Sequence, residues 1–533
     1  MGEVLLKIAS SLVCTAFFFA VSVKSLGALQ QSGYQGKKFL KWLKHKENLY
    51  FNRLALLSGL LLLSCAVFSL TFSLFSVQIG NFLSALPFIF FCILFIVCDG
   101  KYALKVPLKF TERVRRLSIA YAFLLACVSY LVIASLLAVN ELIASEIYGV
   151  FAYLPVCLLP MLTPFVLWLA NAVISPYEQS RNQKFVQKAN DKLNQTEMLK
   201  IGVVGSFAKT SVKHILATLL SEKYTVVSTP ESYNTPLGLA KTVFSPAFEN
   251  KQVLIAEMGA RKIGDIAELC ALVEPDCAVF TGVCEQHIES FGSIENVWEG
   301  KSEIFAGVKN FVVCGKTIKS RFAKLSQDIQ EKCVFVQDTA VKDVKYRATE
   351  TEFTLSLQGE EIAVKTKLLG EGAVENILLA VTLCEKLGLS SAEIQQGLQK
   401  ITPVPHRLEL VESAGAYILD DAYNSNPEGA KMALNALKRF TGKKIVVTPG
   451  IVETGILNEA INGKLGEELV GFDQVILVGD TLVTAVKNGY LTAGGKAEQI
   501  TVVPTLEKAE DILGHTLSTG DAVLFLNDLP DVY

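Results

Sequence analysis

The sequence predicts an α/β protein that carries an all-α, membrane-spanning region at its N-terminus. Hydrophobic residues make up 51% of the 533 residues, and the long apolar stretches are confined to residues 1–176. From residue 199 onward, short β-branched runs alternate with helical patterns, which is typical of a parallel sheet covered by helices. The first of these runs leads into a loop of small residues at 205–210. We therefore expect membrane helices followed by α/β domains.

Five apolar stretches are each long enough to cross the roughly 30 Å hydrocarbon core of a bilayer. They span residues 4–26, 54–75, 79–98, 117–139 and 148–175. Apart from Lys7 and Lys24, near the ends of the first, no charged residue lies within them. This favours an anchor over a transporter. A cleaved signal peptide is disfavoured because further spans follow the first.

The basic residues of the connecting loops predict the orientation. Lysines and arginines gather in the loops at 37–53 and 101–116, whereas the loop at 140–146 has none. Because positively charged loops stay in the cytoplasm, the N-terminus is expected outside and everything after Pro176 inside. The prediction is a multi-pass protein of the plasma membrane with cytoplasmic catalytic domains.

Charge and cysteine content exclude other classes. The net charge of −2 provides no basic field for nucleic acid. The twelve cysteines are scattered without a CxxC pair, which disfavours a zinc site or a disulfide framework. We expect the soluble part to lie in a reducing compartment.

The loop at 205–210 predicts a phosphate site. Residues 200–204 are typical of a buried strand, and the next residues turn into a helical pattern: Gly205, Ser206, Phe207, Ala208, Lys209, Thr210 and Ser211. In a P-loop of this form, backbone N–H groups hold phosphate oxygens, the lysine bridges the terminal phosphates and the threonine hydroxyl reaches Mg²⁺. The alternative for the loop alone is an ordinary strand-to-helix turn.

After the membrane region, the hydrophobic pattern of the sequence predicts a linker and two domains. Residues 177–198 are polar and helix-compatible, and we expect a juxtamembrane linker there. Residues 199–404 are expected to form a P-loop central domain with a hairpin insertion at 344–367. A second alternating series predicts a Rossmann-like domain at 405–533.

Three further residues support a phosphate-transfer site. Glu257 ends the strand-like run VLIAE, where a carboxylate beside a P-loop can hold a metal ion. His287 follows another strand, and Lys301 lies in a helical segment. The alternatives are an ordinary strand-end glutamate, a surface histidine and a solvated lysine.

Several segments together resemble the Mur ligase family of ATP-dependent amide-forming enzymes of peptidoglycan precursor synthesis. The likeness is greatest to its D-alanyl-D-alanine-adding (UDP-N-acetylmuramoyl-tripeptide) ligases. The segments are GSFAKTSVK (205–213), TPESYNTPLG (229–238), EMGA (257–260), QHIESFGSIENVWEGKSEIF (286–305), HRLE (406–409), LDDAYNSNP (419–427) and TPGIVETG (448–455). The resemblance covers about residues 199–533 and none of the first 176.

The resemblance implies ATP and Mg²⁺ as cofactors and assigns a role to each matching residue. The nucleotide-binding residues would be Gly205, Ser206, Ala208, Lys209, Thr210, Ser211, Asn376, Arg407 and Asp421. The residues around the metal ions would be Thr210, Glu257, His287 and Lys301, with Lys301 at the position of a lysine that the family carbamylates. The catalytic residues would be Lys209, Lys301 and His287, and the substrate-binding residues Asn234, Thr235, Tyr423, Asn424 and Asn426.

Three departures distinguish the chain from the family pattern. Ala208 stands where the loop normally has glycine, and Gly372-Ala373 replaces a His-Asn pair near the nucleotide. The domain that normally binds the uridine nucleotide is missing, and the membrane spans occupy its place. We therefore hypothesise that the acceptor is lipid-linked or is presented at the membrane.

The predicted function is a membrane-anchored, ATP-dependent acid–amino acid ligase that acts through an acyl phosphate. It would add D-Ala-D-Ala or another amine to a muramyl-peptide or lipid-linked cell-wall precursor, alongside cell-wall synthesis proteins. The alternatives are a folylpolyglutamate- or cyanophycin-type ligase, or a catalytically weakened, nucleotide-binding membrane scaffold. The sequence leaves open the amine, the acceptor, the carbamylation of Lys301 and the oligomeric state.

Overall fold

The computed structural model describes residues 2–44, 107–143, 154–336, 340–423 and 425–527. The described chain divides into two compact units, which meet in sequence between Arg181 and Asn182. The first unit is helical, and the second contains three β-sheets with their covering helices.

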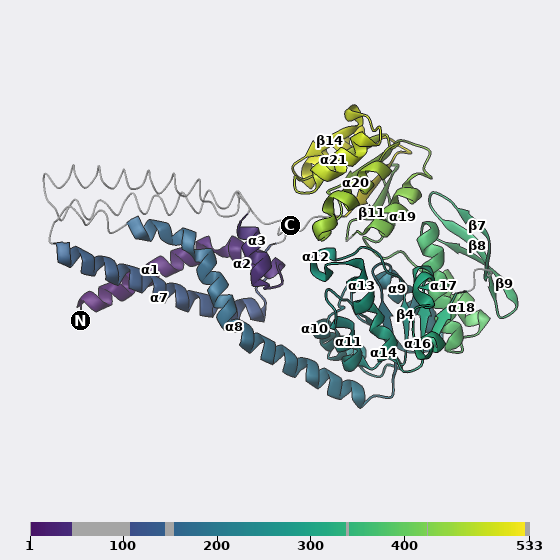
Figure 1. Cartoon of the computed structure of the whole chain (residues 1–533), viewed down its shortest axis with the longest axis horizontal. Helices are drawn as coiled ribbons and strands as arrows, with labels where there is room; N and C mark the ends of the chain where they lie inside the picture. The colour runs from purple at the N-terminus through teal and green to yellow at the C-terminus, as the bar shows by residue number, and fades with distance from the viewer. Residues whose placement is uncertain (1, 45–106, 144–153, 337–339, 424, 528–533) are drawn as a thin grey trace. The chain divides into compact units, whose positions relative to one another are not determined.

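The described part of the first unit consists of three long and two short helices (Figure 1) around an apolar core. Its helices are α1 (Gly2–Val21), α2 (Val23–Gln31), α3 (Gly36–Leu43), α7 (Glu112–Ile143) and α8 (Leu154–Asn194), the last continuing into the second unit. Phe18, Leu29, Phe39, Tyr121 and Leu167 are buried together between them. The helices of this unit are therefore held by one shared core.

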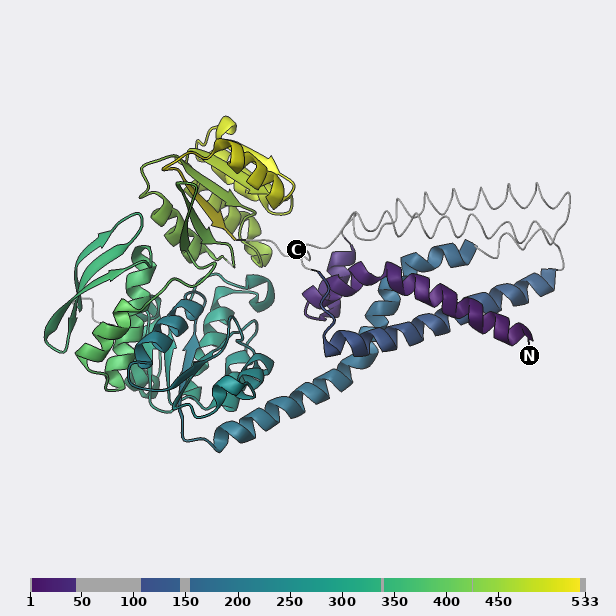
Figure 2. The ribbon, with the colours of Figure 1, turned by 180° about the vertical axis from the view of Figure 1, so that it is seen from behind.

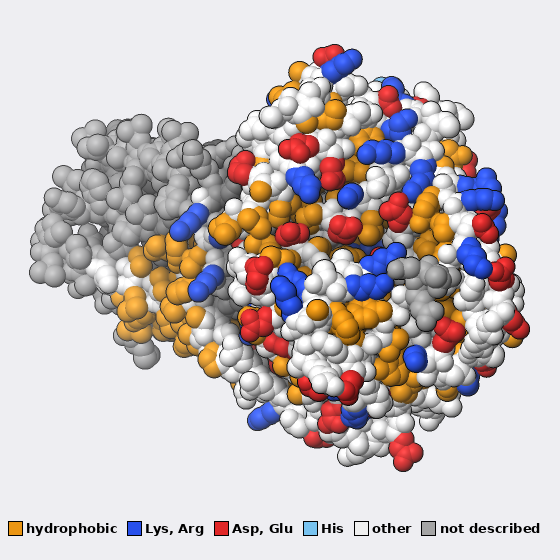
Figure 3. Space-filling view, turned by 45° about the vertical axis from the view of Figure 1, so that its right-hand side comes forward, with side chains coloured by type: hydrophobic (Ala, Val, Ile, Leu, Met, Phe, Trp, Pro, Cys, Tyr) orange, Lys and Arg blue, Asp and Glu red, His pale blue; other side chains and the backbone are white. Residues whose placement is uncertain are grey.

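The outer faces of α7 and α8 are apolar as well. Ile119 and Phe123 on α7 are 71% and 68% exposed, and Val173 on α8 is 62% exposed. In Figure 3 hydrophobic side chains gather on the described helices of this unit, whereas charged and hydrophobic side chains mix over the second unit. A soluble helix normally turns such a face toward a core.

The membrane prediction is met only in part. Among the described residues, one segment, Glu112–Val132, is long and apolar enough to cross a membrane. The predicted spans 54–75 and 79–98 lie outside the described residues. The first predicted span, 4–26, is interrupted at Ser22, where α1 ends and α2 begins. Beyond its apolar part, α8 runs through the predicted linker to Asn194.

The second unit begins with a parallel six-stranded sheet in the order β2-β3-β1-β4-β5-β6. Figure 1 marks its strand β4, and Figure 2 shows the same unit from behind. The strands of this sheet are β1 (Leu199–Val204), β2 (Val226–Ser228), β3 (Val253–Glu257), β4 (Cys277–Phe280), β5 (Phe311–Cys314) and β6 (Cys333–Phe335). Side chains alternate between two cores, with Ile201 and Val203 on one face and Val204 on the other. This confirms the predicted α/β pattern with helices on both faces.

Helices cover both faces of this sheet. They are α9 (Lys209–Leu220), α10 (Pro236–Val243), η2 (Pro246–Phe248), α11 (Asp265–Val273), α12 (Ile288–Phe291), α13 (Ile294–Ser302), α14 (Ile304–Gly307), α15 (Lys316–Phe322), α16 (Gln327–Lys332), α17 (Gly370–Lys386) and α18 (Ser391–Gln399). The register pairs Val203 of β1 with Glu257 of β3. The loop after β1 and the end of β3 therefore lie at the same edge of the sheet.

A small antiparallel sheet follows where the sequence predicts a hairpin. It comprises β7 (Val341–Tyr346), β8 (Thr351–Leu357) and β9 (Glu360–Thr366). The predicted hairpin corresponds to β8 and β9, and β7 adds a third strand beside β8. Phe353 and Leu355 of β8 join the core beneath α9 and α17.

The last part of the chain forms another six-stranded sheet, in the order β10-β11-β15-β12-β13-β14. Its strands are β10 (Glu409–Ser413), β11 (Ala416–Asp421), β12 (Lys444–Thr448), β13 (Gln474–Val478), β14 (Ile500–Val503) and β15 (Ala522–Leu526). Its helices are α19 (Pro427–Leu437), η4 (Gly455–Leu457), α20 (Asn458–Glu468), α21 (Val483–Thr492), η5 (Ala497–Gln499) and α22 (Leu506–Thr516). Only β10 is antiparallel to its neighbour, so the predicted Rossmann-like pattern holds with one added edge strand.

Candidate active site

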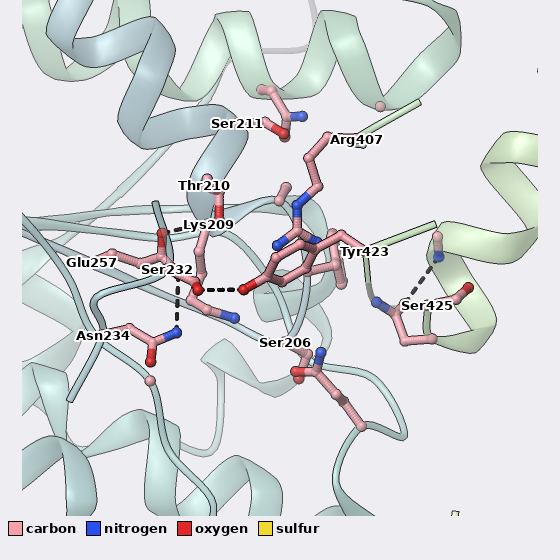
Figure 4. A pocket seen from close by; sticks show the side chains of 18 of the residues that line it. Ser206, Lys209, Thr210, Ser211, Ser232, Asn234, Glu257, Arg407, Tyr423 and Ser425 are labelled. Atoms are coloured by element: carbon pink, nitrogen blue, oxygen red, sulfur yellow. Dashed lines mark hydrogen bonds between the residues drawn. The ribbon is translucent and has the colours of Figure 1, made fainter. Parts of the chain in front are cut away.

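A cavity of about 410 Å³ lies at the carboxyl edge of the first sheet and is closed on one side by the second α/β domain. Its walls are the loop after β1, the end of β3, the start of α17 and the segment from β11 into α19. In open parallel sheets, ligands bind at this edge. Figure 4 shows Lys209, Thr210 and Glu257 on one wall and Arg407 and Tyr423 reaching from the other domain.

The loop after β1 requires glycine at its first position. Gly205 has a φ of +153°, and a Cβ there would lie 1.9 Å from Thr281 Oγ1. The hydroxyl of Thr281 donates to the carbonyl of Phe207 at 2.6 Å, which fixes the loop against β4. Lys209 folds back over the loop and donates to the carbonyl of Gly205 at 2.8 Å. The loop and its lysine therefore have the form of a phosphate cradle at the start of α9.

Ala208 is the residue before this lysine and caps α9 in a left-handed conformation, with a φ of 59°. The sequence identifies this position as one where glycine is expected, and the structure supplies the reason. Glycine adopts positive φ without steric cost, whereas an alanine Cβ approaches the neighbouring carbonyl.

Glu257 is the acidic centre of the site and is only 1% exposed. Its carboxylate accepts from the Thr210 hydroxyl at 3.0 Å and from Asn234 at 3.1 Å, and it pairs with Lys213 at 3.1 Å. Burial alone would raise the pKa of Glu257, but Lys213 and Lys209 outweigh burial and hold it below its usual value. Glu257 is therefore an anion at neutral pH.

The donor set at Glu257 fits a magnesium ion. The Thr210 hydroxyl and the Glu257 carboxylate provide two hard oxygens 3.0 Å apart at the phosphate loop. Mg²⁺ is usually bound through one or two protein oxygens together with substrate phosphates and water. Among the described residues, no group of three or more His, Cys, Asp or Glu side chains forms a metal cage. A site completed by nucleotide phosphates agrees with both observations.

Lys301 lies beneath the loop at the end of α13 and is 1% exposed. Its Nζ donates to the carbonyl of Gly205 at 3.1 Å. Burial lowers the pKa of Lys301 well below its ordinary value, and the nearby Lys209 lowers it further. Lys301 is therefore no solvated lysine, but a buried amine whose neutral form is easier to reach than that of an exposed lysine.

His287 stands at the start of α12, also with a positive φ of 57°. Its Nδ1 contacts the carboxylate of Glu453, a residue of the C-terminal domain. Burial lowers the pKa of His287, and Arg261 and Lys301 also lower it, while Glu453 opposes them. The imidazole is therefore neutral and lines the cavity instead of lying on the surface.

The C-terminal domain contributes a positively charged wall. The guanidinium of Arg407 stacks 4.0 Å from the centre of the Tyr423 ring, whose hydroxyl donates to Ser232 of the central domain. Asp421 accepts from the backbone N–H of Leu408 at 3.1 Å. Burial raises the pKa of Asp421 to about 7, although Arg407 lowers it. Of these contacts, the bond from Tyr423 to Ser232 joins the two domains across the cavity.

The far end of the cavity is apolar and differs from the family pattern at Gly372. A Cβ at Gly372 would lie 2.8 Å from the sulfur of Met432. Met432 therefore occupies the space into which a larger side chain at 372 would extend. Asn376, one helical turn further along α17, lines the same end together with Ala373.

The structure brings nearly all of the predicted site residues to this one cavity. Those that line it are Ser206, Ala208, Lys209, Thr210, Ser211, Asn234, Thr235, Glu257, His287, Lys301, Asn376, Arg407, Asp421, Tyr423 and Asn426. Gly205, the first residue of the loop, does not line the cavity but accepts from Lys209 through its carbonyl, and Asn424 lies outside the described residues. Asn426 caps α19 and accepts from the Cys284 thiol at 3.4 Å.

Among the residues that sequence reasoning missed at the site are Lys213, Ser232, Met432 and Glu453. Lys213 lies one helical turn after Lys209, so its spacing could have identified it. Glu453 contacts a residue 166 positions away in sequence, and no local pattern indicates that contact.

Comparison with known proteins agrees with this geometry. Residues 203–384 match the family described as "Mur ligase middle domain", and residues 406–527 match "Mur ligase, glutamate ligase domain". The chain is 29% identical over 336 residues to the UDP-N-acetylmuramoyl-tripeptide–D-alanyl-D-alanine ligase of Bacillus subtilis, covering 61% of this chain and 72% of that one. The Escherichia coli ligase of the same name is 29% identical over 290 residues, covering 52% of this chain and 64% of that one.

Solved structures show the same fold. The MurF ligase of Thermotoga maritima in complex with ADP superposes with a TM-score of 0.58 and 27% identity, covering 65% of this chain and 80% of that one. A MurF structure from Acinetobacter baumannii gives a TM-score of 0.58 at 22% identity, covering 65% of this chain and 77% of that one.

Proposed function

Because the chain belongs to the Mur ligase family of ATP-dependent, amide-forming ligases, we propose that this cavity joins an amine to the carboxylate of a cell-wall precursor. The observation that carries the proposal is the contact between Thr210 and Glu257 beside Lys209. It places a phosphate-binding lysine and two hard oxygen ligands together at the carboxyl edge of a parallel sheet.

In the first step, a carboxylate oxygen of the acceptor attacks the γ-phosphorus of ATP, the bond to the ADP oxygen breaks, and an acyl phosphate forms. Lys209 and Arg407 would bind the phosphoryl oxygens from opposite walls of the cavity. Mg²⁺, held beside Thr210 and Glu257, would neutralise charge on these oxygens. Glu257 is suited to this role because it stays ionised.

In the second step, the amine nitrogen attacks the acyl carbon, phosphate leaves with the electron pair of the broken C–O bond, and the nitrogen loses a proton. Asn234, Thr235, Tyr423 and Asn426 line the cavity and would position the acceptor and the amine. The contact between Tyr423 and Ser232 closes the cavity on one side. Closure protects an acyl phosphate from water.

Lys301 is proposed to act after carbamylation. Attack on CO2 requires a neutral amine, and burial favours that form of Lys301. The product would be an anion beneath the loop, in the cavity that His287 also lines. Mass spectrometry of the intact protein in bicarbonate, compared with Lys301→Met, would detect the added 44 mass units that CO2 contributes to lysine. Absence of the adduct under turnover conditions would contradict this role.

The first unit is proposed to anchor the ligase in the plasma membrane, with the second unit in the cytoplasm. Support comes from the apolar segment Glu112–Val132 and from the exposed apolar side chains of α7 and α8. We propose that the acceptor is lipid-linked or is presented at the membrane. Assays of the full chain with a UDP-linked muramyl-peptide and with its lipid-linked counterpart should show higher kcat/KM for the latter. A preference for the soluble acceptor would contradict the lipid-linked proposal but not the ligase activity.

A nucleotide-binding scaffold with weakened catalysis is the second candidate. Two features favour it, because both alter the nucleotide site relative to the family pattern. Ala208 has a left-handed backbone, and the Met432 side chain fills the space beside Gly372. Phosphate release that requires ATP, an amine and an acceptor together would support the ligase, and nucleotide binding without turnover would support the scaffold. A screen of D-Ala-D-Ala and single amino acids would also identify the amine. Lys209→Ala should abolish turnover.

A further inference from the structure

Glu453 links the C-terminal domain to the catalytic wall of the central domain by three contacts. One carboxylate oxygen accepts from Arg261 at 2.7 Å, and the other contacts Nδ1 of His287. The Glu453 carbonyl accepts from the backbone N–H of Glu289 at 3.0 Å. Both carboxylate oxygens of Glu453 and its backbone carbonyl therefore contact the central domain.

The loop that carries Glu453 is fixed from its own domain. Asn462 is fully buried, and its side chain both donates to and accepts from the backbone of Ile451, at 2.9 and 2.7 Å. Asn527 donates to the carbonyl of Gly450 at 2.7 Å. These bonds hold the loop rigidly at two points just before Glu453, so the position of its carboxylate follows the position of the domain.

Glu453 and His287 both have unusual backbones. Their φ values are each 57°, in the left-handed region, which histidine enters more often than most residues and glutamate only rarely. Strained conformations that meet at one contact often mark a functional constraint. Gly455 also lies against this region, since a Cβ there would be 2.9 Å from Glu289 Cα.

The contact determines which nitrogen of His287 faces the cavity. A carboxylate only accepts hydrogen bonds, so the proton of the imidazole must lie on Nδ1. The lone pair is then on Nε2, the nitrogen left available for a metal ion or a substrate proton. His287 is only 12% exposed, so water does not easily replace Glu453 in this role.

We propose that Glu453 is a positioning residue that sets the tautomer and orientation of His287, and does so only when the C-terminal domain is closed. Domain closure would thereby complete the metal-binding side of the site, in addition to covering it. The inference rests on the proposed role of His287 as a metal ligand. Arg261 would only hold the Glu453 carboxylate to the central domain through an ion pair.

The test compares Glu453→Gln with Arg261→Gln in the full chain. Glu453→Gln keeps the shape of the side chain but replaces an acceptor-only carboxylate by a neutral amide that can donate as well as accept, so the tautomer of His287 is no longer imposed. Arg261→Gln removes the interdomain ion pair and leaves the contact between the Glu453 carboxylate and the imidazole in place. The measurement is the dissociation constant of Mn²⁺ in the presence of ADP, followed by electron paramagnetic resonance without turnover. Unchanged thermal unfolding midpoints would show that both variants fold.

Loss of an outer hydrogen-bond partner of a metal-ligating histidine typically weakens metal binding about 10- to 100-fold. We expect Glu453→Gln to raise the Mn²⁺ dissociation constant by about 10-fold or more, and Arg261→Gln by about 3-fold or less. Equal effects of the two substitutions would show that Glu453 only holds the domains together, which would contradict the proposal. An unchanged Mn²⁺ affinity in Glu453→Gln would also overturn it. Because the measurement requires no turnover, its outcome is independent of failure to find amide synthesis in the wild-type protein.

Discussion

At the scale of single residues, Ala208 holds a backbone conformation that its side chain disfavours. We predict that Ala208→Gly stabilises the protein by about 0.5 to 1 kcal/mol, because relief of about 1–2 kcal/mol in the left-handed region exceeds the added entropy of the unfolded chain. The same substitution at Ala217, inside α9, should instead destabilise by about 1 kcal/mol. Chemical unfolding of the two variants measures both signs. A loss of stability in Ala208→Gly would contradict the account of the loop.

Asp421 gives a prediction about pH. Its pKa is raised from 3.8 to about 7 in the folded protein, so the folded state holds a proton that the unfolded chain releases. The associated stability is present below pH 3.8 and is lost as pH rises through about 7. The free energy of unfolding of the wild type should therefore fall relative to that of Asp421→Asn between pH 4 and pH 8. Parallel curves for the two proteins would show that Asp421 is not buried as described.

Residues found by sequence reasoning share one property: they belong to short, contiguous motifs. Lys209 and Thr210 follow a strand directly, and Glu257 ends the next strand in the sheet. Glu453 lies in the motif TPGIVETG, but its role could not be found in this way, because its partners Arg261 and His287 belong to another domain. Only the packing of the two domains shows what this glutamate does.

At the scale of secondary-structure elements, α7 and α8 are joined by a nearly buried ion pair. Arg116 donates twice to Glu178, at 2.6 and 3.0 Å, and the carboxylate is 2% exposed. Glu178→Gln leaves Arg116, which is 23% exposed, without its charged partner, so it should destabilise the first unit by about 1.5 to 3 kcal/mol.

The matched control for this pair is Glu112→Gln on the same helix α7. Glu112 pairs with Arg115 at 2.8 Å, but both side chains are about two-thirds exposed. Its loss should cost no more than about 0.5 kcal/mol. Thermal unfolding of the full chain in detergent compares the two variants, and similar midpoints for both would contradict the assigned burial of Glu178.

Elements with strong hydrophobic patterns were predicted correctly, and short or polar ones were not. The runs VLIAE and KKIVVT appear as β3 and β12. By contrast, β2 and β6 have three residues each, and the exposed, polar edge strand β10 (ELVES) has no buried face. An edge strand of this kind is specified by its pairing with β11, which the local sequence does not reveal.

At the scale of the whole molecule, the apolar faces of the first unit predict tight association with a bilayer. Exposed side chains such as Ile119, Phe123 and Val173 would be costly in water. We predict that the full chain stays in the membrane fraction after washing with high salt and with alkaline carbonate, and that detergent releases it. Release by either wash would show that the chain is attached peripherally.

The membrane region and the α/β part of the molecule were predicted from different features of the sequence. Hydrophobicity alone predicts membrane spans, of which the structure describes one that meets the length and composition required. The α/β part follows from alternating patterns and motif order, and the family matches agree with it. The substrate does not follow from either, because it depends on what binds between the two domains.

The central claim is that the cavity activates a carboxylate as an acyl phosphate before the amide forms. The most direct measurement uses an acceptor in which both carboxylate oxygens are labelled with ¹⁸O and follows the label by mass spectrometry of the released phosphate. The account predicts that each phosphate released during amide synthesis carries one labelled oxygen, and that Lys209→Ala releases none. Phosphate without the label would contradict it, because ATP would then be hydrolysed by water instead of activating the acceptor.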